Sequence, residues 1–171
     1  SFDDSIWDEG EGGFGYGDND DGTIVYQALS VYFRTTFNVE DISKFTSAII
    51  SADYDDGFIA YINGYEIGRS YNLPEPGTFV PFDTQTFYDH EASLYSGGLP
   101  ESILIDSLEL NNILVNGDNV FAVQLHNVST SSSDMSGNFY LTFGIADDSE
   151  FYLDPPFWFQ EPVVHDESNL P

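Results

Sequence analysis

The chain has no cysteine, which excludes disulfide bonds, cysteine-ligated zinc and thiol catalysis. Basic residues are nearly absent as well: three Lys and Arg stand against 30 Asp and Glu, and the formal net charge is −27. A field of this sign repels nucleic acid, anionic lipid and sulfated or uronate polysaccharide unless cations intervene. We therefore expect no nucleic-acid partner.

Long apolar runs are also missing. The sequence contains no stretch of about 18 apolar residues and no basic segment followed by an apolar one, so we expect no membrane insertion. Ser1 looks like an internal cut, and a signal peptide would lie upstream of it. The length of 171 residues fits one domain with a real hydrophobic core, and we expect a monomer.

Strand patterns dominate the chain. Apolar and polar residues alternate, with many aromatic and β-branched types, over 31–37, 58–62 and 120–125, and strands are also expected at 45–51 and 139–145. Asn63-Gly64 predicts a tight hairpin turn, because both residues tolerate positive φ. Only Pro100 to Asn112 has a helical pattern. Long Gly-, Asp- and Ser-rich loops separate the strands at 8–23, 72–98 and 129–137.

A change in composition divides the chain near residue 154. We predict a β-sandwich binding module over 1–154 and a Pro-rich, acidic linker or packed tail over 155–171. Within this tail, Phe157-Trp158-Phe159 is a segment that can pack back on the sandwich.

Four segments carry a family resemblance. They are Phe2 to Ser5 with Trp7, Gly10 and Gly13 to Asp18; Tyr32-Phe33-Arg34 with Phe37; Asp55 to Gly64 with Glu66 and Arg69; and Asn116-Gly117, Asn119-Val120, Ala122-Val123, His126-Asn127 and Ser132-Ser133-Asp134. In this order they resemble the galactose-binding-like jelly-roll modules of large secreted bacterial proteins, of the type found beside phosphatase or spore-coat-kinase-like domains.

The resemblance implies an all-β jelly-roll β-sandwich of two antiparallel sheets with long loops. It also implies a secreted, extracellular or cell-surface location and adjacent domains in a longer chain. It does not imply a ligand, because this fold hosts glycan binders, adhesion modules and plain spacers alike. The insert from Phe79 to Gly98 is longer than expected for the family and is a candidate carrier of ligand preference.

Two acidic loops are candidate calcium sites. The first offers Asp18, Asn19, Asp20, Asp21 and Thr23, and its oxygens suit the six to eight oxygen ligands that calcium takes. Its alternative is a solvated turn in which Asp side chains cap backbone amides.

The second loop offers Asp53, Asp55 and Asp56 directly before a strand, where a structural role in the turn competes with metal binding. The acidity itself has three explanations, which are solubility, adaptation to salt and binding of divalent cations, and the sequence leaves them open.

The arginines and the histidine have structural and ligand-binding interpretations. We expect Arg34 to form an ion pair, reaching Asp134 or Asp56, while Arg34 or Arg69 bonding to sugar hydroxyls remains the alternative. His126 with the serines before Asp134 has the residue types of a nucleophilic triad, but no nucleophile-elbow glycines surround either serine. A hydrogen-bonded histidine that holds this loop is favoured, and with 30 acids a carboxylate pair carries no signal for glycoside hydrolysis.

Aromatic residues in the loops are candidates for glycan contact, because sugar sites combine a flat ring with polar hydrogen-bonding groups. The candidate ligand-binding residues are Trp7, Arg69, Tyr71, Tyr88, Tyr95, His126 and Asp134. The leading hypothesis is a non-catalytic, calcium-stabilised carbohydrate-binding or adhesion-associated module that recognises a neutral or calcium-bridged glycan. A structural spacer without soluble ligand is the alternative, and a hydrolase ranks third.

Overall fold

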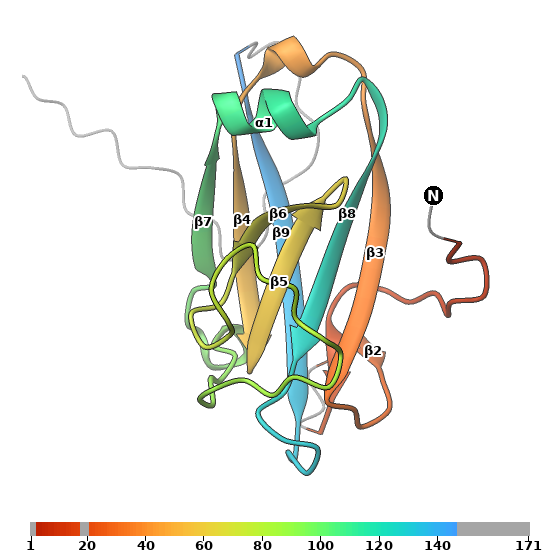
Figure 1. Cartoon of the computed structure of the whole chain (residues 1–171), viewed down its shortest axis with the longest axis vertical. Helices are drawn as coiled ribbons and strands as arrows, with labels where there is room; N and C mark the ends of the chain where they lie inside the picture. Colours follow the sequence, from red (N-terminus) through yellow and green to blue (C-terminus); the bar gives the residue numbers. More distant parts are fainter. Residues whose placement is uncertain (1–2, 18–20, 147–171) are drawn as a thin grey trace, which may run out of the picture.

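The computed structural model describes residues 3–17 and 21–146, which form an all-β sandwich of two sheets (Figure 1). The predicted jelly-roll β-sandwich is thereby confirmed. The first sheet has the order β2-β1-β9-β4-β7, with strands Thr23–Ile24, Phe14–Tyr16, Met135–Ile145, Phe45–Asp55 and Glu101–Asp106. The second has the order β3-β8-β5-β6, with strands Ser30–Val39, Gly117–His126, Gly57–Ile62 and Tyr65–Arg69. Neighbouring strands run antiparallel except β1 and β2, which are parallel.

The core lies between the two sheets, where alternate residues of each strand point inward. From the first sheet it contains Ala48, Ile50, Ala52, Tyr54 and Ile105; from the second, Phe58, Ala60, Ile62, Phe121, Val123 and Leu125. Aromatic rings fill its width, with Tyr54 edge-on to Phe58 at a centroid distance of 4.7 Å. The continuous burial at the end of β4 and the start of β5 marks the point where the chain crosses from one sheet to the other.

The predicted hairpin at Asn63-Gly64 is confirmed. Asn63 and Gly64 have φ of 52° and 84°, and the turn joins β5 to β6. The Asn63 side chain donates to the carbonyls of Ile113 and of the Asn119 side chain, both at 2.8 Å, and accepts from Val120 N at 2.9 Å. The turn is therefore fastened to strand β8 and to the loop before it.

The helix expected over 100–112 is only partly present. Glu101–Asp106 is strand β7, and the helix α1 covers Ser107–Ile113. All six residues of β7 pair with β4 along the sheet edge, and this pairing overrides the helical pattern there. Asp106 caps the helix by accepting from Glu109 N at 2.9 Å. In the described ranges no helix is long and apolar enough to cross a membrane.

The loop from residue 70 to residue 99 covers part of the outer face of the second sheet. Leu73 and Val80 pack on Ile59, which points outward from β5. The Val80 carbonyl accepts from Gln124 Nε2 at 2.9 Å, and further along the loop the Phe82 carbonyl accepts from Ser30 Oγ at 2.8 Å. In Figure 1 this yellow-green segment crosses in front of β5 and β8. The two short 3-10 turns are η1, Ile42–Lys44, and η2, Leu94–Ser96.

Asn119 ties the β5–β6 turn to the start of β8, and its replacement tests this connection. The fully buried side chain donates to the Val115 and Gly117 carbonyls and accepts from Val115 N and Asn63 Nδ2. Asn119→Ala leaves these buried partners without their hydrogen bonds, so we expect the free energy of unfolding in urea to fall by about 2–3 kcal/mol. Asn112→Ala, an exposed control, should change it by less than about 0.5 kcal/mol. Equal losses in the two variants would contradict this assignment.

Candidate functional site

Three carboxylates meet at the lower end of the sandwich in Figure 1, where β4 ends and β9 begins. One oxygen from each of Asp55, Glu91 and Asp134 lies within 4.8 Å of the other two. Asp55 is buried, Asp134 is half-buried and Glu91 is exposed, so the group opens from the protein interior to solvent. We call these three residues the acidic cluster.

Two neighbouring aspartates position the acidic cluster by binding backbone amides. Asp56 accepts from His90 N at 2.8 Å and from Val128 N at 2.7 Å. Asp53 accepts from Ser93 N at 2.6 Å and also caps the turn η2. Because the residues on both sides of Glu91 are held in this way, its carboxylate is brought toward the end of β4. Asp53 and Asp56 therefore have a structural role, which is to accept hydrogen bonds from backbone amides. This was the alternative to metal binding in the interpretation of the sequence.

Asp55 differs from its neighbours in its environment. The side chain is buried beside the carboxyl group of Asp56. Burial, followed by repulsion from Asp56, Asp134 and Glu91, raises the pKa of Asp55 to about 8. A cation placed between the carboxylates would offset this repulsion. The donor set of three carboxylates suits a hard cation such as calcium.

Asn127 and Tyr16 lie beside the acidic cluster. Asn127 Nδ2 donates to the Asp134 carbonyl at 2.9 Å and to the Tyr16 hydroxyl at 3.0 Å. Its Oδ1 is buried and has no hydrogen-bond partner in the described part of the chain. Burial raises the pKa of Tyr16, and the charges of Asp55 and Asp134 raise it further. An unpaired amide oxygen is the kind of ligand that calcium accepts.

The first acidic loop is described only in part. Asp18, Asn19 and Asp20 lie outside the described residues. Asp21 Oδ1 accepts from Ser136 Oγ on β9 at 3.4 Å, and Thr23 Oγ1 donates to the Glu11 carbonyl at 2.7 Å. Gly17, which precedes the loop, lies against Asp134. A Cβ atom added to Gly17 would stand only 2.8 Å from the Asp134 Cα. Gly17 therefore lies beside the acidic cluster.

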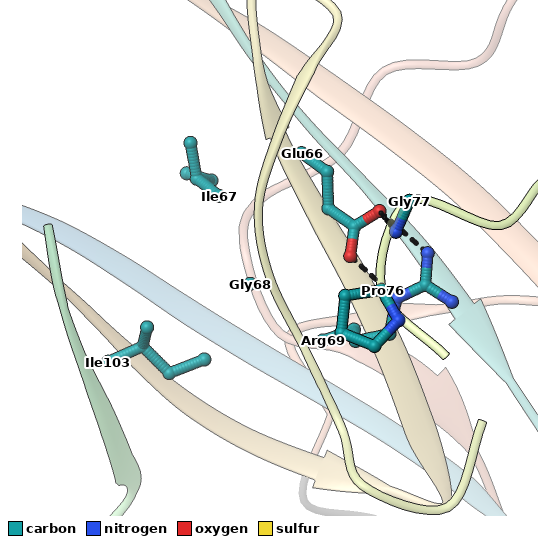
Figure 2. Close-up of a pocket in the computed structure, with 7 residues that line it drawn as sticks. All are labelled: Glu66, Ile67, Gly68, Arg69, Pro76, Gly77 and Ile103. Carbon is teal, nitrogen blue, oxygen red and sulfur yellow. Dashed lines mark hydrogen bonds and ion pairs between the residues drawn. The ribbon is translucent and has the colours of Figure 1, made fainter. Parts of the chain in front are cut away.

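The two arginines form ion pairs within the chain. Arg34 pairs with Asp4, with 3.0 Å between Nε and Oδ2, instead of reaching Asp134 or Asp56. The Arg69 guanidinium faces the Glu66 carboxylate in Figure 2, with two contacts of 2.6 Å, and also donates to the carbonyls of Pro74 and Thr78. The Arg69–Glu66 pair fastens the start of the 70–99 loop to β6. The same two residues line a pocket of about 460 Å³, together with Ile67, Gly68, Pro76, Gly77 and Ile103.

The loop tyrosines and Trp7 are solvent-accessible. Tyr71, Tyr88 and Tyr95 are 68%, 61% and 65% exposed. Tyr88 lies two residues before His90, whose amide binds Asp56, and therefore belongs to the same stretch of the loop as Glu91. Trp7 is 38% exposed and lines a separate groove on the outer face of the second sheet.

His126 is fully buried at the end of β8. Its Nδ1 donates to the Thr84 carbonyl at 2.8 Å, which holds the 70–99 loop, and its Nε2 has no hydrogen-bond partner among residues 3–17 and 21–146. Ser133 Oγ donates to Asp134 at 2.7 Å. No bond joins His126 to either of these two residues in the described structure.

Sequence reasoning missed Glu91, Asn127 and the residues around Trp7. Glu91 lies 36 positions after Asp55, and no motif links the two in sequence. Asn127 belongs to one of the segments that carry the family resemblance, but the sequence assigned no role to it. Tyr61 and Gln124 were assigned only to strand patterns. In the structure a loop buries Ile59 and leaves a groove beside it. No local pattern in the sequence indicates that a loop will cover part of a sheet in this way.

No protein-family model and no curated protein sequence matches the chain. Among solved structures, it is similar to an α-L-rhamnosidase from Streptomyces avermitilis complexed with L-rhamnose, with 20% identity and a TM-score of 0.41. It is also similar to a native α-L-rhamnosidase from Aspergillus terreus, with 17% identity and a TM-score of 0.43. These matches cover 83% and 89% of this chain, which spans 12% and 16% of the two enzymes.

The buried His126 predicts a loss of stability in mild acid. Burial lowers its pKa below the ordinary 6.5, so the unfolded state binds this proton more readily than the folded state. Its contribution to stability is present above about pH 6.5 and is lost as the pH falls, by up to about 1.4 kcal/mol per pH unit. Urea unfolding at pH 7.5 and 5.5 should show a smaller loss for His126→Gln than for the unmodified chain. The same loss in both proteins would contradict the assignment.

Proposed function

We propose that this chain is a non-catalytic carbohydrate-binding module of a larger secreted protein, stabilised by calcium at the acidic cluster. The observation that carries the proposal is the meeting of Asp55, Glu91 and Asp134 at one end of the sandwich, beside a loop that exposes three tyrosine rings. The module positions its neighbouring domains on a glycan and performs no reaction itself.

Calcium is supported by the donor set and by charge. Three carboxylates supply hard oxygen ligands, and water or sugar hydroxyls complete the six to eight that calcium takes. A divalent cation also reduces the repulsion within a chain of net charge −27. Of the three candidate ligands in the second acidic loop, the proposed site keeps Asp55, whereas Asp53 and Asp56 bind backbone amides.

Glycan binding is supported by the surroundings of the acidic cluster. Glu91 is exposed, so a bound cation would keep coordination positions open to solvent. Vicinal sugar hydroxyls can fill such positions, and Tyr88 offers an aromatic ring nearby for the apolar face of the sugar. This arrangement fits a neutral glycan, or an anionic one that calcium bridges to the protein.

Calcium binding should raise the melting temperature. At fixed ionic strength, we expect millimolar calcium to raise Tm above its value in chelator by roughly 5 °C or more, because a metal that binds only the folded state stabilises it by mass action. Glu91→Gln and Asp134→Asn should abolish most of this shift. Asp89→Asn, an exposed carboxylate of the same loop, should retain it. A shift that is absent, or equal in all variants, would mean that the acidity serves solubility or salt adaptation.

A glycan array tests the second half of the proposal. We expect the purified, folded domain to bind a defined glycan class with millimolar calcium and to lose this binding in chelator. Tyr88→Ala should weaken the calcium-dependent signal, whereas Tyr65→Ala, an exposed ring on the β5–β6 hairpin, should leave it unchanged. If the folded domain binds no glycan either with calcium or with chelator, the carbohydrate-binding proposal is wrong and the chain is better described as a structural spacer.

A further inference from the structure

Strand β7 leaves a free edge on the first sheet. Its six residues, Glu101–Asp106, pair with β4 on one side, and no strand within the described ranges pairs with the other side. In Figure 1 this strand runs along the left edge of the sandwich. Alternate backbone N–H and C=O groups of an edge strand point away from the sheet, so they are a template for one further strand.

β7 lacks the features by which edge strands usually avoid such pairing, namely Lys or Pro within the strand, or a β-bulge. Residues 101–106 include neither Lys nor Pro, and their pairing with β4 is regular throughout. The two carboxylates, Glu101 and Asp106, stand at the ends of the strand. Between them Leu104 is 68% exposed, beside its ladder partner Ile49, which is 37% exposed. The middle of β7 is therefore apolar and open to a partner.

The edge strand of the second sheet, β6, is better protected. Its ladder with β5 is irregular between Ala60 and Tyr61. Residues 74–78 also fold back on this strand through hydrogen bonds to Arg69 and Glu66. Of the two edges on this side of the sandwich, β7 is therefore the better template for a further strand.

A pocket adjoins the free edge of β7. It has a volume of about 460 Å³ and is lined by Ile103 of β7, by residues 66–69 of β6, and by Pro76 and Gly77 (Figure 2). Ile103 points toward the second sheet, where its Cδ1 lies 2.6 Å from the place of a Cβ added to Gly68. A residue opposite Ile103 on an added strand would point the same way. Its side chain would therefore enter the pocket.

Charge selects the kind of partner. The pocket has no net charge, because Glu66 and Arg69 pair with each other, but β7 has a carboxylate at each end and the chain carries a net charge of −27. A basic segment is therefore attracted and an acidic one is repelled. A second copy of this chain is disfavoured for the same reason. Two β7 edges paired with Ile103 opposite Leu104 would place Glu101 opposite Asp106, and like charges in such pairs are destabilising.

We propose that the free edge of β7 binds a basic, extended segment of a partner polypeptide as an added antiparallel strand. A large apolar side chain opposite Ile103 fills the pocket between β7 and β6, and an apolar side chain opposite Leu104 covers that residue on the outer face. Lys or Arg residues lie opposite Glu101 and Asp106. This surface needs no calcium and is independent of the cation and glycan sites proposed above.

Fluorescence anisotropy with a defined peptide tests the added strand. The probe is fluorescein-labelled Lys-Thr-Val-Phe-Thr-Lys, whose Val and Phe would lie opposite Leu104 and Ile103. It is titrated with the purified chain in chelator at about 0.15 M salt. We expect saturable binding that becomes roughly tenfold weaker when Phe is replaced by Ala, and that is lost when both Lys are replaced by Glu. Absence of saturable binding, or equal affinities of the Lys and Glu peptides, would overturn the proposal.

Two N-methylated probes test whether the peptide pairs through its backbone. Methylation of alternate residues directs the methyl groups toward β7 in one of these peptides and toward solvent in the other. We expect the first peptide to lose binding and the second to retain it. Equal affinities of the two would show that the peptide does not pair as a strand, and the proposal would be wrong.

Variants of the chain locate the bound peptide. Leu104→Lys places a basic residue on the free edge, so we expect it to weaken binding of the unmethylated probe roughly tenfold or more. Leu108→Lys makes the same change on α1, where Leu108 is 73% exposed, and should bind the probe as the unmodified chain does. Equal affinities of the two variants would contradict the proposal. Sedimentation that shows a dimer of the unmodified chain, dissociated by Leu104→Lys, would also contradict it, because the edge would then bind a second copy.

Discussion

The scarcity of cations decides how this chain can bury carboxylates. With three basic residues for 30 acidic ones, most buried acids must find partners other than Lys or Arg. Asp53 and Asp56 find them in the backbone amides of the 84–94 loop and of Val128, and Asp41 and Asp106 cap short helices in the same way. These bonds hold the long loop against the end of the sandwich. Asp55 is the exception, because it faces other carboxylates, and for this reason we propose the cation site at the end of β4.

Both arginines form ion pairs, although Arg34 pairs with Asp4 and not with the expected Asp134 or Asp56, and each pair fastens a segment of the chain. Arg69 and Glu66 hold the start of the 70–99 loop on β6, and Arg34 and Asp4 hold the N-terminal segment on β3. Both loops then pack over the outer face of the second sheet without covering it completely. The acidic cluster and the groove that Trp7 lines are therefore consequences of loop anchoring on a regular sandwich. Function that is built in this way can vary with the loops while the sheets stay the same.

The sequence predicted the regular parts of the structure well. Alternation located β3, β4, β5, β8 and β9, and Asn63-Gly64 located the hairpin, because both signals depend on neighbours in the sequence. The short strands β1 and β2 were not predicted, because they lie in a Gly- and Asp-rich segment that was expected to be a loop. The helical pattern before Asn112 was misleading for Glu101–Asp106, where pairing with β4 outweighs local preference. The acidic loops were recognised, but composition could not show that Asp53 and Asp56 bind amides while Asp55 meets Glu91 and Asp134. Such contacts join residues that lie far apart in the chain, and only the fold specifies them.

The central claim is that the acidic cluster is a specific cation site. Terbium, which occupies calcium sites and emits when a nearby tyrosine transfers excitation energy, measures this directly, since Tyr16 lies beside the cluster. In 100 mM salt we predict tyrosine-sensitised emission that saturates, is displaced by calcium, and disappears in the double variant Glu91→Gln with Asp134→Asn. Emission that is absent, or that persists unchanged in the double variant, would contradict the account and leave the acidity as a general surface property.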